Sequence, residues 1–223
     1  GKYRDALQSI DKRMEVSWSA KDTALAAQDY VGKAWLLIDG WKDISNGWKE
    51  AEKSFPFRDK IKSQNYWGNI SLLYVYHGDY AAADTVFKNV RWWQQALQSI
   101  GYSLRKDCAN GELFADSAEN AGTRIVPLNT LSPLVECQLE AGLFDKALAS
   151  IIKLRNLKEA AGTPLYVRSF FLAGKVYEKK GERRLAIENY EKFLDIWKNA
   201  DKDLPDYIDA KARLAKLKAV ASK

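Results

Sequence analysis

The stretch GKVYEKKGERRLAIENYEKFLDIW, residues 174–197, is rich in charge, yet its small and aromatic residues lie at fixed distances. Counted from Gly181, a small residue lies seven positions earlier and an aromatic residue four positions earlier. An alanine follows five positions after Gly181, and bulky apolar residues follow at nine and twelve. The residues at these positions are Gly174, Tyr177, Ala186, Tyr190 and Phe193.

The same spacing recurs around two other glycines, Gly78 and Gly142. Each has an alanine five positions later and apolar residues nine and twelve positions later. In chain order the matching residues are Ser71, Tyr74, Ala83, Phe87 and Val90 for the first, and Val135, Gln138, Ala147, Ile151 and Leu154 for the second. Three segments therefore share one template, as internal repeats do.

Each segment reads as two helices joined by a tight turn. Apolar residues three and four positions apart line one face of a helix. The glycine ends the first helix because it adopts a left-handed backbone at little cost. Acids just after it (Asp79, Asp145 and Glu182) suit the positive start of the next helix. The alanine lets the two helices approach closely, and such hairpins must stack to cover their apolar sides.

This template resembles the tetratricopeptide repeat, a helical hairpin with a period of 34 residues. The three matching units cover residues 64–97, 128–161 and 167–200, although Gln138 replaces the usual aromatic residue and all three lack the proline that usually ends a unit. The resemblance predicts an all-α protein, an α-solenoid in the form of a right-handed superhelix with about ten helices.

The remaining segments complete a single array over residues 1–223. We expect a helix at 1–20, a degenerate hairpin at 22–57 that turns at Gly40, and a capping helix at 206–221. Gly78 and Gly142 are more than one period apart, so residues 98–127 break the rhythm. Two interpretations remain open: an insertion that projects and binds a partner, or a degraded repeat that packs in line.

The tail after residues 190–200 resembles the end of tetratricopeptide regions in large bacterial signalling proteins. There the array follows a kinase, cyclase or DNA-binding domain. The resemblance implies that this chain is the regulatory, partner-sensing part of a larger protein.

The composition of the chain limits which partners and which cellular compartment are expected. The net charge is +6, but basic residues alternate with acids, so the sequence does not favour a nucleic-acid partner. Two cysteines, Cys108 and Cys137, are too few for a disulfide framework, and we expect reduced thiols in the core. No apolar run is long enough to span a membrane. We expect a cytoplasmic protein whose oligomeric state the sequence leaves open.

The sequence predicts no enzymatic activity. His77, the single histidine, lies beside Gly78 and reads as a helix-end or surface residue rather than a catalytic base. With one histidine, no histidine-based triad has a spare partner. The glycines are scattered as helix stops instead of forming a phosphate-binding loop, and no metal constellation is present. We therefore expect no cofactor and no metal.

The resemblance implies that the first helix of each hairpin lines a concave groove that binds a peptide or partner protein. By register, the groove-lining residues are Asn65, Leu72, Tyr76, Asn129, Ser132, Glu136, Glu140, Arg168, Phe171, Lys175 and Lys179. Phe171 is expected to offer an apolar anchor beside the basic residues of its helix. The groove changes from aromatic and amide, through acidic, to basic, which suits a peptide of mixed charge.

Two classes of function remain. The first is a non-enzymatic scaffold for protein interaction. Chaperone-binding relatives hold a terminal carboxylate, but Glu136 would repel one here, so that partner is not expected. The alternative is a regulatory domain that binds a small molecule and switches an attached effector. The alternative requires a closed pocket lined by tryptophans in place of an open groove.

Overall fold

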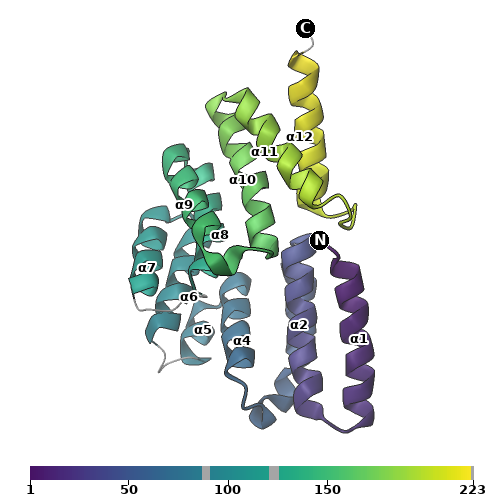
Figure 1. The fold of residues 1–223 in the computed structure, drawn as a ribbon. Helices are drawn as coiled ribbons and strands as arrows, with labels where there is room; N and C mark the ends of the chain where they lie inside the picture. The colour runs from purple at the N-terminus through teal and green to yellow at the C-terminus, as the bar shows by residue number, and fades with distance from the viewer. Residues whose placement is uncertain (87–90, 121–125, 222–223) are drawn as a thin grey trace. The chain divides into compact units, whose positions relative to one another are not determined.

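The computed structural model describes residues 1–86, 91–120 and 126–221 (Figure 1). Within these ranges, the side chains of residues 64, 65, 91–93, 119, 126–129, 220 and 221 are not described. All regular elements in the described ranges are helices, twelve of them α-helical, which confirms the all-α prediction and slightly exceeds the expected number. The chain divides into two compact units, residues 1–89 and 90–223.

Unit 1 contains five α-helices and one short 3₁₀ helix. Their bounds are α1 (Tyr3–Ser19), α2 (Thr23–Trp41), α3 (Ile44–Glu52), η1 (Phe55–Lys60), α4 (Gln64–His77) and α5 (Tyr80–Val86). Helix α2 pairs with α3 and α4 pairs with α5, while α1 packs on α2. The template residues Phe87 and Val90, predicted for the second helix of the α4/α5 pair, lie outside the described residues.

Unit 2 contains seven α-helices and one short 3₁₀ helix. Their bounds are α6 (Arg91–Leu104), α7 (Cys108–Asn120), α8 (Val126–Glu140), α9 (Phe144–Asn156), η2 (Lys158–Ala160), α10 (Pro164–Lys180), α11 (Arg183–Ile196) and α12 (Pro205–Ala221). Three hairpins, α6/α7, α8/α9 and α10/α11, follow one another, and α12 packs on α11. The unit is thus a stack of helical hairpins closed by a single helix.

The five hairpins of the two units share one turn geometry. A residue with positive φ ends each first helix, and the residue after it donates its backbone N–H to a carbonyl four positions before the turn residue, or five positions before it in the α2/α3 hairpin. The turn residues are Lys42, Gly78, Lys106, Gly142 and Gly181. Two of the five are lysines, so this turn does not depend on glycine.

An aspartate follows three of these turn residues and caps the next helix. Asp43, Asp79 and Asp107 each accept a hydrogen bond from the backbone N–H three positions later. The backbone and side-chain amides of Asn46 lower the pKa of Asp43, and the same groups of Asn110 lower the pKa of Asp107. The acids after the turn therefore have a structural role as helix caps.

The turn of the first hairpin differs from its prediction. Gly40 lies inside α2 and packs against the ring of Tyr3, while Lys42 makes the turn. Counted from Lys42, Gly47 takes the position that alanine holds in the other units. A methyl group at Gly47 would lie 2.6 Å from Ile38 Cγ1 and 2.9 Å from the carbonyl oxygen of Ala34. The small residue of the template is therefore present, but displaced by two residues.

Residues 98–127, expected to interrupt the array, lie mostly in the α6/α7 hairpin. Lys106 makes the turn, and Gly111 lies at the alanine position, where a methyl group would meet Ser103 Oγ at 2.5 Å. Helices α6 and α7 both pack on α8. The described part of this segment is therefore a helical hairpin that contacts α8.

The two cysteines do not remain reduced. Cys108, the first residue of α7, forms a disulfide with Cys137 of α8. The prediction of free thiols is wrong. It treated each cysteine as a separate small core residue, whereas the hairpin α6/α7 places the two Cα atoms 5.7 Å apart.

The alanines of the template are buried, as predicted. Ala83, Ala147 and Ala186 are each exposed by 1% or less. We expect Ala186→Leu to lower the free energy of unfolding by about 1–3 kcal/mol, because the larger side chain overpacks the contact between α10 and α11. Denaturant unfolding measures this loss. Ala212→Leu, at an exposed position of α12, is the control and should change stability little; equal stability of both variants would contradict the packing described here.

Candidate functional site

The predicted groove residues of unit 1 differ in their exposure. Leu72 is buried in the core, while Tyr76 is partly exposed and packs edge-on against Trp35, with ring centroids 5.6 Å apart. The side chain of Asn65 lies outside the described residues. The two described residues therefore do not present one continuous exposed surface.

In α8, the predicted groove residues form polar contacts rather than a free acidic surface. Ser132 is buried, Glu136 is partly exposed, and Glu140 forms an ion pair of 2.6 Å with Lys106. The side chain of Asn129 lies outside the described residues. Two of the three described residues, Ser132 and Glu136, meet Arg168 of α10.

Arg168 of α10 links three helices of unit 2. It contacts α8, the first helix of the preceding hairpin, and α12, the closing helix. Its Nε donates to Asp206 Oδ2 of α12 at 2.7 Å. Its Nη1 donates to Ser132 Oγ at 2.9 Å and to Glu136 Oε1 at 2.5 Å. Burial alone would lower the pKa of the guanidinium, but the charges of Glu136 and Asp206 outweigh burial and raise it. Arg168 is thus held by the fold and is not an available groove cation.

A second arginine makes a similar link between α10 and α12. Arg213 donates to Glu178 Oε2 at 3.0 Å and to both oxygens of Asp209 at 2.9 Å. Tyr190 of α11 donates its hydroxyl proton to the same Glu178 oxygen at 2.8 Å. Burial of the ring, followed by the bond to Glu178, raises the pKa of Tyr190. Glu178 is therefore neutralised within the fold.

The other predicted residues of α10 divide into one buried ring and two lysines. Phe171 is 2% exposed and packs against Tyr190 and Phe193. It does not offer the exposed apolar anchor that the sequence suggested, because the second helix of its own hairpin covers it. Lys175 Nζ lies 5.4 Å from the centroid of the Phe171 ring, and Lys179 is exposed. These two lysines remain the accessible part of the predicted basic strip.

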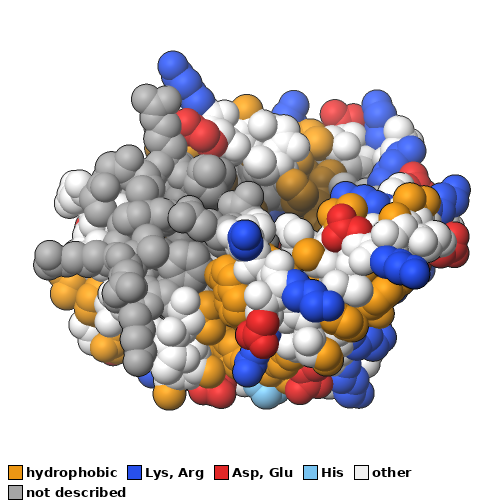
Figure 2. All heavy atoms as spheres, turned by 90° about the horizontal axis from the view of Figure 1, so that it is seen from below, with side chains coloured by type: hydrophobic (Ala, Val, Ile, Leu, Met, Phe, Trp, Pro, Cys, Tyr) orange, Lys and Arg blue, Asp and Glu red, His pale blue; other side chains and the backbone are white. Residues whose placement is uncertain are grey.

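His77 belongs to an aromatic cluster that sequence reasoning missed. Its ring stacks on Trp48 with centroids 4.2 Å apart, and Trp48 also contacts Tyr74 and Phe55. Figure 2 shows hydrophobic side chains beside this histidine, the one pale blue group. The histidine is exposed at the end of α4, as predicted.

A shallow pocket lies beside the turn between α10 and α11. Its lining residues are Glu178, Gly181, Arg183, Lys216 and Leu217. It contains no tryptophan, so it is not the tryptophan-lined pocket that a ligand-sensing domain would require. Across the described ranges, no three metal-ligating side chains are grouped together, and no helix has the length and apolar character needed to cross a membrane.

Comparison with known proteins gives a match for the hairpin formed by α10 and α11. Residues 167–196, which span most of α10 and α11, match the family model of the tetratricopeptide repeat. The chain contains a tetratricopeptide repeat. Neither curated proteins nor solved structures give a match.

The match falls on the hairpin whose spacing follows the template most closely. Gly174, Tyr190 and Phe193 all lie in the matched tetratricopeptide repeat, and a methyl group at Gly174 would meet the ring of Tyr190 at 2.5 Å. The close approach of α10 and α11 therefore explains why this position is glycine. The other hairpins share the turn geometry of this tetratricopeptide repeat while keeping fewer of its residues.

Proposed function

We propose that the chain is a non-enzymatic scaffold that binds a partner protein or peptide. The partner lies along the exposed side of the first helix of each hairpin. Tetratricopeptide repeats generally mediate interactions between proteins, which supports this class of function. The resemblance of the tail to bacterial signalling proteins adds that the array is the regulatory part of a larger protein.

The observation that carries the proposal is the charge state of the α10 surface. The acids beside it, Glu136 and Glu178, are neutralised by Arg168 and Arg213. Among the described residues, no carboxylate pairs with Lys175 or Lys179. The two lysines are four residues apart and therefore share a helix face. This surface favours acidic groups on the partner.

The partner that fits is an acidic segment rather than one built around a bulky apolar residue. Phe171 is covered, so the surface has no open aromatic ring to receive such a residue. Carboxylates placed one helical turn apart could each meet one lysine. Charge complementarity of this kind raises the association rate and the specificity of binding.

The proposal is tested by reversing the two lysines. A partner is first captured from the source cell and identified, and its affinity for the full chain is measured by titration. We expect Lys175→Glu with Lys179→Glu to weaken binding by at least tenfold, because attraction becomes repulsion. Stability should change by no more than about 1 kcal/mol, because Lys179 is exposed and Lys175 has only its contact with the Phe171 ring to lose.

The matched control is Lys192→Glu with Lys198→Glu, two exposed lysines at and beyond α11. It makes the same change in net charge on another surface and should keep the affinity within about twofold. Equal affinities for the two double variants, with circular dichroism unchanged, would contradict the α10 surface as the binding site.

A further inference from the structure

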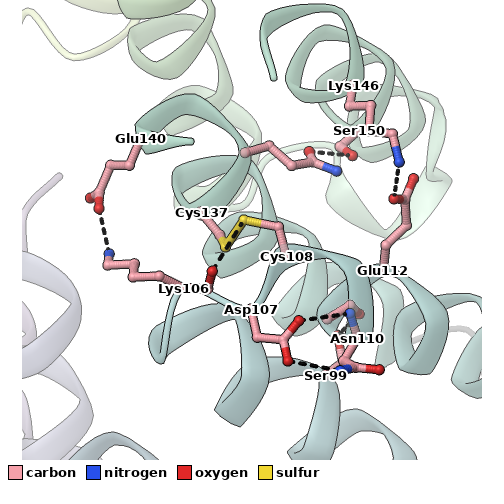
Figure 3. Close-up of a disulfide and its surroundings, with 12 residues drawn as sticks. Ser99, Lys106, Asp107, Cys108, Asn110, Glu112, Cys137, Glu140, Lys146 and Ser150 are labelled. Atoms are coloured by element: carbon pink, nitrogen blue, oxygen red, sulfur yellow. Dashed lines mark hydrogen bonds and ion pairs between the residues drawn. A yellow bond between two sulfur atoms is a disulfide. The ribbon is translucent and has the colours of Figure 1, made fainter. Parts of the chain in front are cut away.

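The disulfide in unit 2 connects two neighbouring hairpins (Figure 3). Cys108 begins α7 and Cys137 lies near the end of α8, so the bond ties the second helix of one hairpin to the first helix of the next. The exposed fractions are 6% for Cys108 and 1% for Cys137. No third cysteine exists in the chain with which either could exchange.

The ion pairs around this junction lie at the surface, while one buried hydrogen bond, from Ser99 Oγ to the Gly111 carbonyl, joins α6 to α7. Lys106 pairs with Glu140, Lys146 pairs with Glu112, and Lys153 pairs with Asp116, at 2.6, 2.6 and 3.1 Å. In each pair at least one side chain is more than half exposed. Exposed ion pairs contribute little, so these links do not by themselves hold α7 in place.

At its template positions, helix α7 brings little apolar volume to the core. At the three template positions after its turn it has Gly111, Ala115 and Ala118, all buried. The corresponding positions of α11 hold Ala186, Tyr190 and Phe193. Smaller side chains bury less apolar area, so α7 gains less stabilisation from packing than α11 does. The first residue of α7 is the one that carries the covalent bond to α8.

We propose that Cys108–Cys137 is a permanent structural disulfide, and that the chain folds and acts in an oxidising compartment outside the cytosol. A regulatory disulfide must be reached by reductants, whereas both of these sulfurs are buried. Permanent disulfides form and persist in secreted, periplasmic or luminal proteins and are rare in the cytosol. The cytoplasmic location expected from the sequence conflicts with this bond.

Formation of the bond requires an electron acceptor. The two thiols together lose two protons and two electrons, and the acceptor is the disulfide of a thiol–disulfide exchange protein. One cysteine thiolate attacks that disulfide and releases the first acceptor thiolate. The second cysteine then attacks the mixed disulfide, which leaves the acceptor as a dithiol. Because the sulfurs are buried in the fold, this exchange occurs before α7 and α8 have packed together.

The inference also limits the compartment in which a partner can be found. This step rests on the proposed function. A segment that binds at Lys175 and Lys179 has to be present in the same oxidising compartment. A cytosolic partner with confirmed binding would contradict the compartment without affecting the α10 surface. The two proposals therefore fail separately.

The test counts thiols in the native protein of the source cell. Cells are quenched in acid, thiols are blocked with a maleimide in denaturant, and the mass of the intact chain is measured before and after reduction. We expect no maleimide on the unreduced chain and two on the reduced chain. Labelling of both cysteines without reduction would overturn the proposal.

A variant measures the structural role. Cys108→Ala with Cys137→Ala should lower the melting temperature of the purified full chain by roughly 10 °C, because the bond closes a loop of this length in the unfolded chain. Glutathione at cytosolic concentration should leave the bond intact in the folded wild type and reduce it in denaturant. Rapid reduction in the folded state, or a variant that melts with the wild type, would show that the bond is not a structural one.

Discussion

Replacement of Arg168 by methionine is expected to lower the free energy of unfolding by about 2–4 kcal/mol. Breaking a buried ion pair by removing one partner typically costs about 3–5 kcal/mol, because the other charge stays buried. Here the side chains of Asp206 and Glu136 are 14% and 38% exposed, so water recovers part of that loss. Denaturant unfolding followed by circular dichroism measures the change.

The control for this variant is Arg184→Met. Arg184 pairs with Glu188 within α11, but its side chain is 84% exposed, so the loss should stay below about 0.5 kcal/mol. Adding Glu136→Gln and Asp206→Asn to Arg168→Met should restore part of the stability, since uncharged amides remove the unpaired charges. Equal losses for Arg168→Met and Arg184→Met would show that the cluster does not hold α8, α10 and α12 together.

The hairpins with glycine turns were predictable from the sequence, and the hairpins with lysine turns were not. Glycine at Gly78, Gly142 and Gly181 marks a left-handed residue directly. A left-handed backbone costs other residues about 1–2 kcal/mol, so Lys42 and Lys106 are not expected there. Two features of the sequence could have identified these turns. An aspartate directly follows each lysine, and a glycine lies five positions after the lysine.

The site was less predictable because its contacts come from outside the repeat template. Register placed Arg168 on the inner face of α10, but its partner Asp206 lies in α12, 38 positions later. Likewise, the burial of Phe171 depends on Phe193, which belongs to the opposite helix of the hairpin. The template of one repeat predicts which residues share a face of a helix. It does not predict which side chains of neighbouring helices contact that face.

The disulfide illustrates the same limit. Cys108 and Cys137 are separated by 29 positions, and nothing in their local sequence relates them. Once Lys106 is placed at a turn, however, Cys108 becomes the start of a helix that packs on α8. The missed hairpin and the missed disulfide therefore have one cause, the unrecognised lysine turn.

The other large effect is expected at Phe193, in the matched tetratricopeptide repeat. Phe193 is fully buried, and its ring centroid lies 5.5 Å from that of Phe171 and 4.9 Å from that of Trp197. Phe193→Ala removes these contacts and leaves a cavity between α10 and α11. The expected loss is about 3–5 kcal/mol in the free energy of unfolding.

Two variants separate this loss from a general effect of changing α11. Phe193→Leu keeps most of the apolar volume and should cost less than Phe193→Ala, about 1–2 kcal/mol. Lys192→Ala changes the adjacent exposed residue and should stay within about 0.5 kcal/mol of the wild type. Unfolding in guanidinium chloride gives all three values on one scale. A loss below about 1 kcal/mol for Phe193→Ala would mean that α11 does not pack through this ring, because a filled core position cannot be emptied at so small a cost.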